Sequence, residues 1–209
     1  MKKKLFLGVY NPSIILTYIS VFCSLYGIGN LMVRFDADPF PSLKLAMILL
    51  IVAGVCDMFD GRVARMCKRT EVEKSFGIQL DSLADTVSFV VFPAVILMYS
   101  SGMMISSIVI AMFYVFAGIM RLGWFNVTTE ENKGYFFGLP VTMSALILPT
   151  WFLLSATLNI PYQTTIQQVV FGATALAFIL NFRLKKPGLI FSIVMVVAAI
   201  AVTVGIVLL

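Results

Sequence analysis

The sequence predicts an all-α bundle of membrane-spanning helices, and three observations support this fold class. Of the 209 residues, 60% are hydrophobic and only 12% are charged, and the mean hydropathy is +1.01. Soluble domains are roughly half apolar, so a chain this apolar is expected in a bilayer. The apolar runs lack the period-two alternation of a membrane barrel, and an open strand edge has no hydrogen-bond partner in lipid, which leaves helices.

Seven apolar runs are long enough to span a hydrocarbon core about 30 Å thick, which needs on the order of 20 helical residues. In chain order, the predicted spans are residues 12–33, 43–62, 76–99, 103–121, 139–158, 165–182 and 189–209. Pro93 and Pro149 lie inside two of these spans and are expected to kink them.

The segment 1–11 precedes the first span and is expected to lie at the cytoplasmic membrane surface. Its basic start is like that of a secretory signal, but no small-residue cleavage site follows, and the first run is long enough to remain as a span. The connections are short and no repeat or linker is evident, so we expect residues 1–209 to form a single membrane domain.

The distribution of basic residues predicts how the chain is oriented in the membrane. If the lysine-rich N-terminus is cytoplasmic and seven spans follow, 13 of the 15 basic residues fall on the cytoplasmic side, leaving only Arg34 and Lys44 outside. The 13 are Lys2, Lys3, Lys4, Arg62, Arg65, Lys68, Arg69, Lys74, Arg121, Lys133, Arg183, Lys185 and Lys186. The net charge of +5 therefore indicates topology and contact with anionic membrane lipids, and no nucleic-acid-binding segment is expected.

The residues available for chemistry are few. The chain has no histidine, which removes imidazole acid–base catalysis and the commonest transition-metal ligand. Cys23, Cys56 and Cys67 have neither metal-binding nor redox spacing, and we interpret them as inert small residues. Any chemistry is therefore expected to use carboxylates and cations.

Four aspartates gather at the predicted cytoplasmic ends of the second and third spans, together with small residues. One helix face of the second span carries Asp57, Asp60, Gly61 and Ala64, at offsets 0, 3, 4 and 7. One face of the third carries Gly77, Asp81 and Asp85, at offsets 0, 4 and 8. Antiparallel helices would turn these faces toward each other. A carboxylate at bilayer depth costs roughly 2.5 to 3.5 kcal/mol on insertion scales, so the cluster indicates a functional site.

Two divalent cations would balance the four carboxylates, and a set of oxygen ligands favours Mg²⁺ or Mn²⁺. A pair of such ions is a common arrangement for phosphoryl chemistry. Glycine and alanine on the same faces would allow a ligand to approach the backbone, and Arg65 could donate to a diphosphate through both guanidinium arms.

These residues resemble the signature of the CDP-alcohol phosphatidyltransferases. The segments Asp57-Met-Phe-Asp60-Gly61-Arg-Val-Ala64-Arg65 and Gly77-Ile-Gln-Leu-Asp81-Ser-Leu-Ala-Asp85 match D-x-x-D-G-x-x-A-R followed by G-x-x-x-D-x-x-x-D at all nine fixed positions. Eleven residues separate Arg65 from Gly77, where the family usually has about eight, an extension that costs little loop-closure entropy.

Three further segments are similar to the phosphatidylserine synthase branch. They are LDSLADTVSF from Leu80, RLGWFN from Arg121 and GLP from Gly138, where the branch usually has LDSLAD-x-VSFG-x-AP, RLARFN and F-x-GLP. The resemblance runs from about Asn11 to Pro149. Val90 replaces a glycine of the branch pattern, and Gly123-Trp124 replaces Ala-Arg.

The resemblance implies a six-helix core plus an extra helix, a homodimer, and transfer of a phosphatidyl group from CDP-diacylglycerol to L-serine with release of CMP. It implies metal binding by Asp57, Asp60, Asp81 and Asp85, the last as ligand or as the base that takes the acceptor's proton. Gly61, Ala64, Arg65 and Gly77 would line the nucleotide and diphosphate, with Thr17 and Asn11 toward the cytidine. We assign the serine carboxylate to Arg121, supported by Asn126, because topology returns both residues to the cytoplasmic face.

Three alternatives remain open at this point. The acceptor could be another alcohol, such as glycerol 3-phosphate or an inositol phosphate, although these would need more cationic residues than Arg121 and Lys133. A membrane prenyltransferase also uses paired aspartate motifs with Mg²⁺, but it releases inorganic diphosphate and lacks the D-G-x-x-A-R segment. A cation transporter would be expected to place its site near the bilayer midplane rather than at the helix ends.

Overall fold

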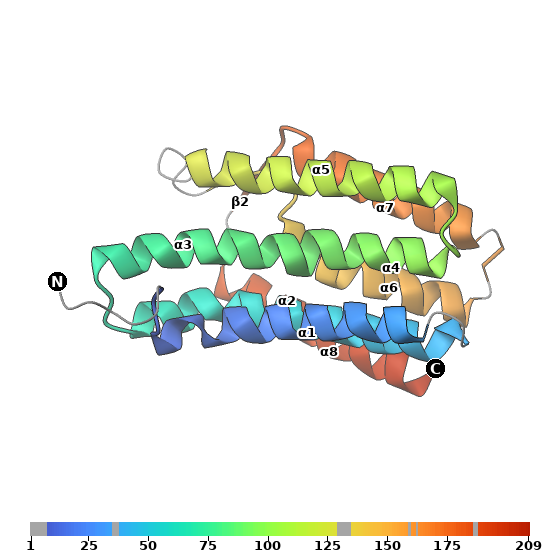
Figure 1. Ribbon diagram of the computed structural model, residues 1–209, viewed down its shortest axis with the longest axis horizontal. Helices are drawn as coiled ribbons and strands as arrows, with labels where there is room; N and C mark the ends of the chain where they lie inside the picture. Colours follow the sequence, from blue (N-terminus) through green and yellow to red (C-terminus); the bar gives the residue numbers. More distant parts are fainter. Residues whose placement is uncertain (1–7, 35–37, 129–134, 159, 162, 186–187) are drawn as a thin grey trace.

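The computed structural model describes residues 8–34, 38–128, 135–158, 160–161, 163–185 and 188–209. Figure 1 shows a bundle of long helices whose axes run roughly along the long dimension of the molecule. The elements, in chain order, are η1 (Pro12–Ile14), α1 (Ile15–Val33), α2 (Pro39–Met66), α3 (Glu71–Asp85), η2 (Thr86–Val91), α4 (Phe92–Ser100), α5 (Ile105–Thr128), β1 (Tyr135–Phe137), η3 (Val141–Met143), α6 (Ser144–Thr157), α7 (Gln163–Ile179), β2 (Arg183–Lys185) and α8 (Leu189–Leu208).

The all-α membrane bundle is confirmed. Within the described residues, seven helical rods follow one another in the order of the seven predicted spans. Five of them are long and apolar enough to cross a membrane: Pro12–Val33, Pro39–Met66, Glu71–Ser100, Ile105–Thr128 and Ile190–Leu208. Of the other two, Val141–Thr157 is a shorter apolar helix and α7 has 17 residues. Seven spans therefore stays a prediction.

The continuous rod formed by α3, η2 and α4 lies at the centre of the bundle (Figure 1). On one side it contacts α1 and α2, and on the other it contacts α5. The most extensive pairings elsewhere join α1 with α2, α5 with α7, and α2 with α6. Because the rod is central, other helices surround its middle part.

Both helices that carry the aspartates continue beyond the predicted spans. Helix α2 ends at Met66 rather than at residue 62, and α3 begins at Glu71 rather than at residue 76. A capping box starts α3, because Thr70 N donates to Glu73 Oε2 over 2.7 Å and Glu73 N donates to Thr70 Oγ1 over 3.3 Å. Hydropathy locates the apolar part of a helix, whereas the caps determine where the helix begins.

A π-helical segment, η2, follows Asp85 directly, and Pro93 explains part of its bonding. Proline has no N–H, so the Phe89 carbonyl four residues earlier lacks its usual helical donor. Tyr114 Oη donates to that carbonyl over 3.1 Å, and Ser144 Oγ donates over 3.4 Å. A π turn therefore precedes Pro93, and side chains of two other helical segments donate to the Phe89 carbonyl. The kink expected at Pro93 stays a prediction.

A short antiparallel ladder was not predicted. β1 pairs with β2, with Phe137 opposite Arg183, and Gly138 N extends the pairing by donating to Phe182 O over 2.9 Å. Gly138 has φ +69°, and a Cβ at this position would lie 2.5 Å from the Phe178 carbonyl oxygen, so only glycine fits. The GLP segment thus ties the entry of α6 to the end of α7.

Candidate active site

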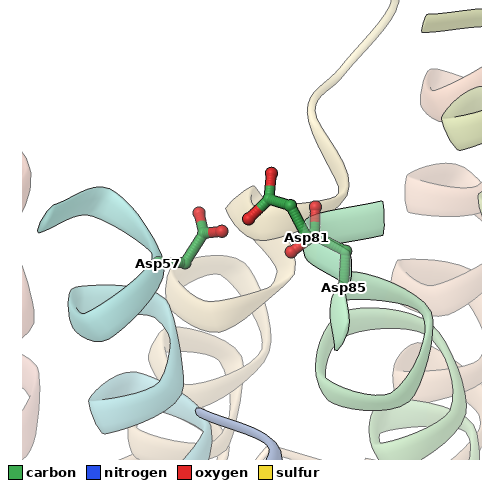
Figure 2. A group of neighbouring side chains, drawn as sticks. All are labelled: Asp57, Asp81 and Asp85. Atoms are coloured by element: carbon green, nitrogen blue, oxygen red, sulfur yellow. The ribbon is translucent and has the colours of Figure 1, made fainter. Parts of the chain in front are cut away.

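Helices α2 and α3 bring the predicted aspartates together. Asp57 lies on α2, and it points across to Asp81 and Asp85 on α3 (Figure 2). Carboxylate oxygens of these three residues all lie within 4.8 Å of one another, and each residue is half-buried. The 3.6-residue helical period accounts for this arrangement, because the four-residue spacing of Asp81 and Asp85 places both on the face that meets α2.

Asp60 lies one helical turn beyond Asp57 and joins the cluster from its edge. Its carboxyl group lies within hydrogen-bonding reach of Asp81, just as Asp57 lies within reach of Asp85. Thr17 Oγ1 of α1 donates to Asp60 Oδ2 over 3.3 Å. The cluster therefore involves three helices, and the Thr17 side chain on α1 is buried.

The cluster concentrates four carboxyl groups in a small volume. Among the described residues, the only salt bridge joins Lys74 to Glu71 at an exposed site. Carboxylates this close repel one another strongly where water is scarce. The donor set consists of carboxylate oxygens alone, which fits a hard divalent cation such as Mg²⁺ or Mn²⁺ rather than a thiolate- or imidazole-binding metal. The site therefore has the chemistry of a metal centre.

The small residues of the motif differ in their exposure. Gly61 is exposed, and Ala64 and Gly77 are half-buried. A Cβ on Gly61 would lie 3.7 Å from Arg65 Nη1, and a Cβ on Gly77 would lie 3.4 Å from Arg69 Nη1. Each motif glycine thus has a guanidinium nitrogen next to the space that a side chain would occupy.

Arg121 is buried, with 7% of its surface exposed. Its Nε donates to the Leu139 carbonyl over 3.2 Å, its guanidinium lies 4.9 Å from the centre of the Phe125 ring, and it interacts electrostatically with Asp85. A pocket of about 430 Å³ adjoins it, lined also by Trp124, Phe137 and Asn181 among others. Arg121 therefore connects the aspartate cluster to a cavity at the end of α5.

Asn126 is one turn further along α5 and contacts a different partner. Its Oδ1 accepts a hydrogen bond from Ser82 Oγ over 3.0 Å, which fastens α5 to the residue after Asp81. Asn11, assigned to the cytidine side, caps η1 by accepting from Ser13 N and donates to the Lys68 carbonyl over 3.5 Å. Residues 1–7 of the predicted interfacial segment, and Lys133, lie outside the described residues.

Sequence reasoning missed the Thr17–Asp60 and Ser82–Asn126 hydrogen bonds, and it gave no role to Arg69. The two bonds join residues 43 and 44 positions apart, so no local pattern could reveal them. Arg69 had one detectable signal: it is a cation inside the extended loop between the two halves of the motif.

Comparison with known proteins relates the chain to one group. The family model described as CDP-alcohol phosphatidyltransferase matches residues 10–207. An archaetidylserine synthase of Methanothermobacter thermautotrophicus is 40% identical over 114 residues, which are 54% of this chain and 48% of that protein. CDP-diacylglycerol–serine O-phosphatidyltransferases of Saccharomyces cerevisiae and Helicobacter pylori are 36% identical over 143 residues and 37% identical over 108 residues. These matches cover 64% and 50% of this chain, and 50% and 44% of the relatives, so the chain spans about half the length of the curated relatives it matches.

Proposed function

This chain belongs to the CDP-alcohol phosphatidyltransferase family, and from that premise we propose that it transfers the phosphatidyl group of CDP-diacylglycerol to the hydroxyl of L-serine, forming phosphatidylserine and releasing CMP. The observation that carries the proposal is the aspartate cluster, in which Asp57, Asp81 and Asp85 present oxygens within 4.8 Å of one another on two facing helices. The names of the relatives support serine as the acceptor.

The aspartates would hold two divalent cations, Mg²⁺ or Mn²⁺, with Asp60 at the edge of the set. When bound, such ions would supply positive charge that stabilises the diphosphate and the departing CMP. The chain's own part is to fix the carboxylates: Thr17 orients Asp60 through its hydrogen bond, and Ser82 fastens the neighbourhood of Asp81 to α5. Gly61, Ala64 and Gly77 would leave room for the nucleotide, and Arg65 would bind the diphosphate.

Asp85 would take the proton of the serine hydroxyl. As the serine oxygen bonds to the phosphatidyl phosphorus, the bond from that phosphorus to the bridging oxygen breaks, and the electron pair leaves with CMP. Arg121 interacts electrostatically with Asp85, so a serine carboxylate bound by Arg121 would bring its hydroxyl toward Asp85. We place the acceptor beside Arg121, with Asn126 supporting the same end of α5.

The proposal includes one membrane domain over residues 1–209, with the N-terminus and the site on the cytoplasmic side, and a homodimer. Five membrane-length helices and the family match over residues 10–207 support the single domain. The basic residues predicted on one side of the membrane support the orientation.

A comparison of CMP release with different acceptor alcohols tests the proposed reaction. Purified protein in lipid nanodiscs receives Mn²⁺, CDP-diacylglycerol or a donor with isoprenoid ether chains, and L-serine, glycerol 3-phosphate, an inositol phosphate or no acceptor. We expect CMP release that requires L-serine, with phosphatidylserine or its ether counterpart identified by mass. Release with a different acceptor would overturn the choice of serine. Release of inorganic diphosphate from a prenyl donor, without CMP, would overturn the reaction class.

A further inference from the structure

We propose that Arg69, in the loop between α2 and α3, is a second diphosphate-binding arginine that acts with Arg65 on the nucleotide donor. The inference rests on the proposed function and adds a binding residue to it. It is drawn from the position of the Arg69 guanidinium relative to Gly77.

The two arginines flank the two motif glycines, Arg65 from α2 and Arg69 from the α2–α3 loop. Arg65 Nη1 lies 3.7 Å from where a Cβ of Gly61 would be, and Arg69 Nη1 lies 3.4 Å from where a Cβ of Gly77 would be. Gly61 shares its helix face with Asp60, and Gly77 shares its face with Asp81. Each half of the motif therefore combines a carboxylate, a glycine on the same helix face and a guanidinium next to that glycine.

The local structure holds Arg69 in this place. Arg69 directly precedes Thr70, the residue whose reciprocal hydrogen bonds with Glu73 start α3. The residue before it, Lys68, accepts a hydrogen bond at its carbonyl from Asn11 Nδ2 over 3.5 Å. The backbone on both sides of Arg69 is thus fastened, and its half-buried side chain reaches two turns along α3 to Gly77.

The charge of Arg69 is available to a ligand. Among the described residues, the only salt bridge is the one between Lys74 and Glu71, so neither Arg69 nor Arg65 is paired there with a carboxylate. A diphosphate diester carries two negative charges, and two arginine forks match both its charge and its oxygen geometry. Glycine at both positions allows phosphate oxygens to reach the guanidinium groups without meeting a side chain.

The test measures binding of CDP, a soluble probe, in the presence of Mn²⁺, to the full chain in nanodiscs of phosphatidylcholine. We expect Arg69→Gln to weaken CDP binding by about ten- to a hundredfold, the usual effect of losing charge-assisted hydrogen bonds, and to leave the weak binding of cytidine unchanged. Arg69→Lys keeps the charge but loses the fork, so an intermediate loss is expected. Lys68→Gln, an exposed neighbour with the same charge change, serves as the matched control and should bind CDP like the unsubstituted chain.

Three results would overturn the proposal. Equal CDP binding by Arg69→Gln and Lys68→Gln, with normal CMP release by the unsubstituted chain, would remove Arg69 from the site and leave the proposed function intact. A defect that appears only when phosphatidylglycerol is added to the nanodiscs would assign the guanidinium to membrane headgroups. Absence of both CDP binding and CMP release in the unsubstituted chain would reject the proposed function together with this inference.

Discussion

At the scale of single residues, the burial of Arg121 is the feature that most needs a function. Removing a guanidinium from water is costly unless its donors are satisfied. The Leu139 carbonyl accepts from Nε, and the Phe125 ring covers one face of the guanidinium. Arg121 also lines a pocket of about 430 Å³ and interacts electrostatically with Asp85, so it is suited to bind the carboxylate of a small acceptor.

We therefore predict that Arg121→Lys raises the KM for L-serine by about tenfold or more, because lysine cannot replace a two-armed contact with a carboxylate. The KM for CDP-diacylglycerol should change little. Steady-state kinetics with each substrate varied in turn measures both values. Arg183→Lys, which alters an exposed arginine over the Phe137 ring, is the matched control. An equal rise in both KM values would indicate a structural role for Arg121 and contradict its assignment to the acceptor.

The positions of the aspartates could be predicted from the sequence, but the hydrogen bonds that hold their side chains could not. Spacings of three and four residues place Asp57 with Asp60, and Asp81 with Asp85, on common faces whatever the rest of the fold is. The hydrogen bond from Thr17 to Asp60 depends on how α1 packs on α2, across 43 residues of sequence. The role of Thr17 at the nucleotide, which the family resemblance implies, stays a prediction.

At the scale of elements, Gly118 of α5 accommodates Val90 of the π turn η2, which stands in place of a glycine of the branch pattern. Val90 is fully buried and packs against Gly118 of α5, where a Cβ would lie 2.6 Å from Val90 Cγ2. The Val90 side chain thus fills the space that a side chain at position 118 would occupy. The close approach of η2 to α5 also places Tyr114 Oη within 3.1 Å of the Phe89 carbonyl.

Gly118→Ala should destabilise the protein by about 1 to 3 kcal/mol, because the added methyl overpacks a filled core. Adding Val90→Ala to that variant should restore most of the loss. Gly123→Ala on the same helix, where a Cβ would meet nothing within 4 Å, is the control and should be neutral or stabilising. Thermal unfolding in detergent measures all three variants. If Val90→Ala gave no rescue, this packing would not be the cause of the loss.

The elements themselves were predictable to different degrees. Long apolar runs located every helical rod of the described residues, because burial in lipid requires an uninterrupted apolar stretch. The extensions of α2 and α3 were not located, since a capping box such as Thr70–Glu73 lies outside the apolar run. The ladder of β1 with β2 has three residues per strand and joins distant segments, so no period-two signal is long enough to predict it.

At the scale of the whole molecule, the α2–α3 loop lies at the end of the bundle at which the described N-terminal residues also lie (Figure 1). The basic residues predict that this end faces the cytoplasm. Cys67 lies in the α2–α3 loop directly after α2, whereas Cys23 and Cys56 lie within membrane-length helices. The native cysteines therefore report the orientation without new substitutions.

We predict that a membrane-impermeant maleimide labels Cys67 in inside-out membrane vesicles and not in intact cells that express the chain. The thiol is half-buried in a loop at the predicted cytoplasmic surface, whereas Cys23 is buried in the protein and Cys56 lies inside a membrane-length helix. Cys67→Ser should abolish the labelling. Labelling of Cys67 from outside intact cells would reverse the proposed orientation.

The most direct test of the central claim is the rate of serine-dependent CMP release by Asp81→Asn in the presence of Mn²⁺. Asp81 lies close to Asp57 and Asp85, and it is also within hydrogen-bonding reach of Asp60. Asparagine keeps the shape of the side chain but removes the charge that would hold a cation. Asp38→Asn is the matched control, because Asp38 caps α2 at its other end and asparagine caps a helix equally well. The account predicts release at background level for Asp81→Asn and an unchanged rate for Asp38→Asn. A folded Asp81→Asn protein that releases CMP at the rate of the unsubstituted chain would contradict it.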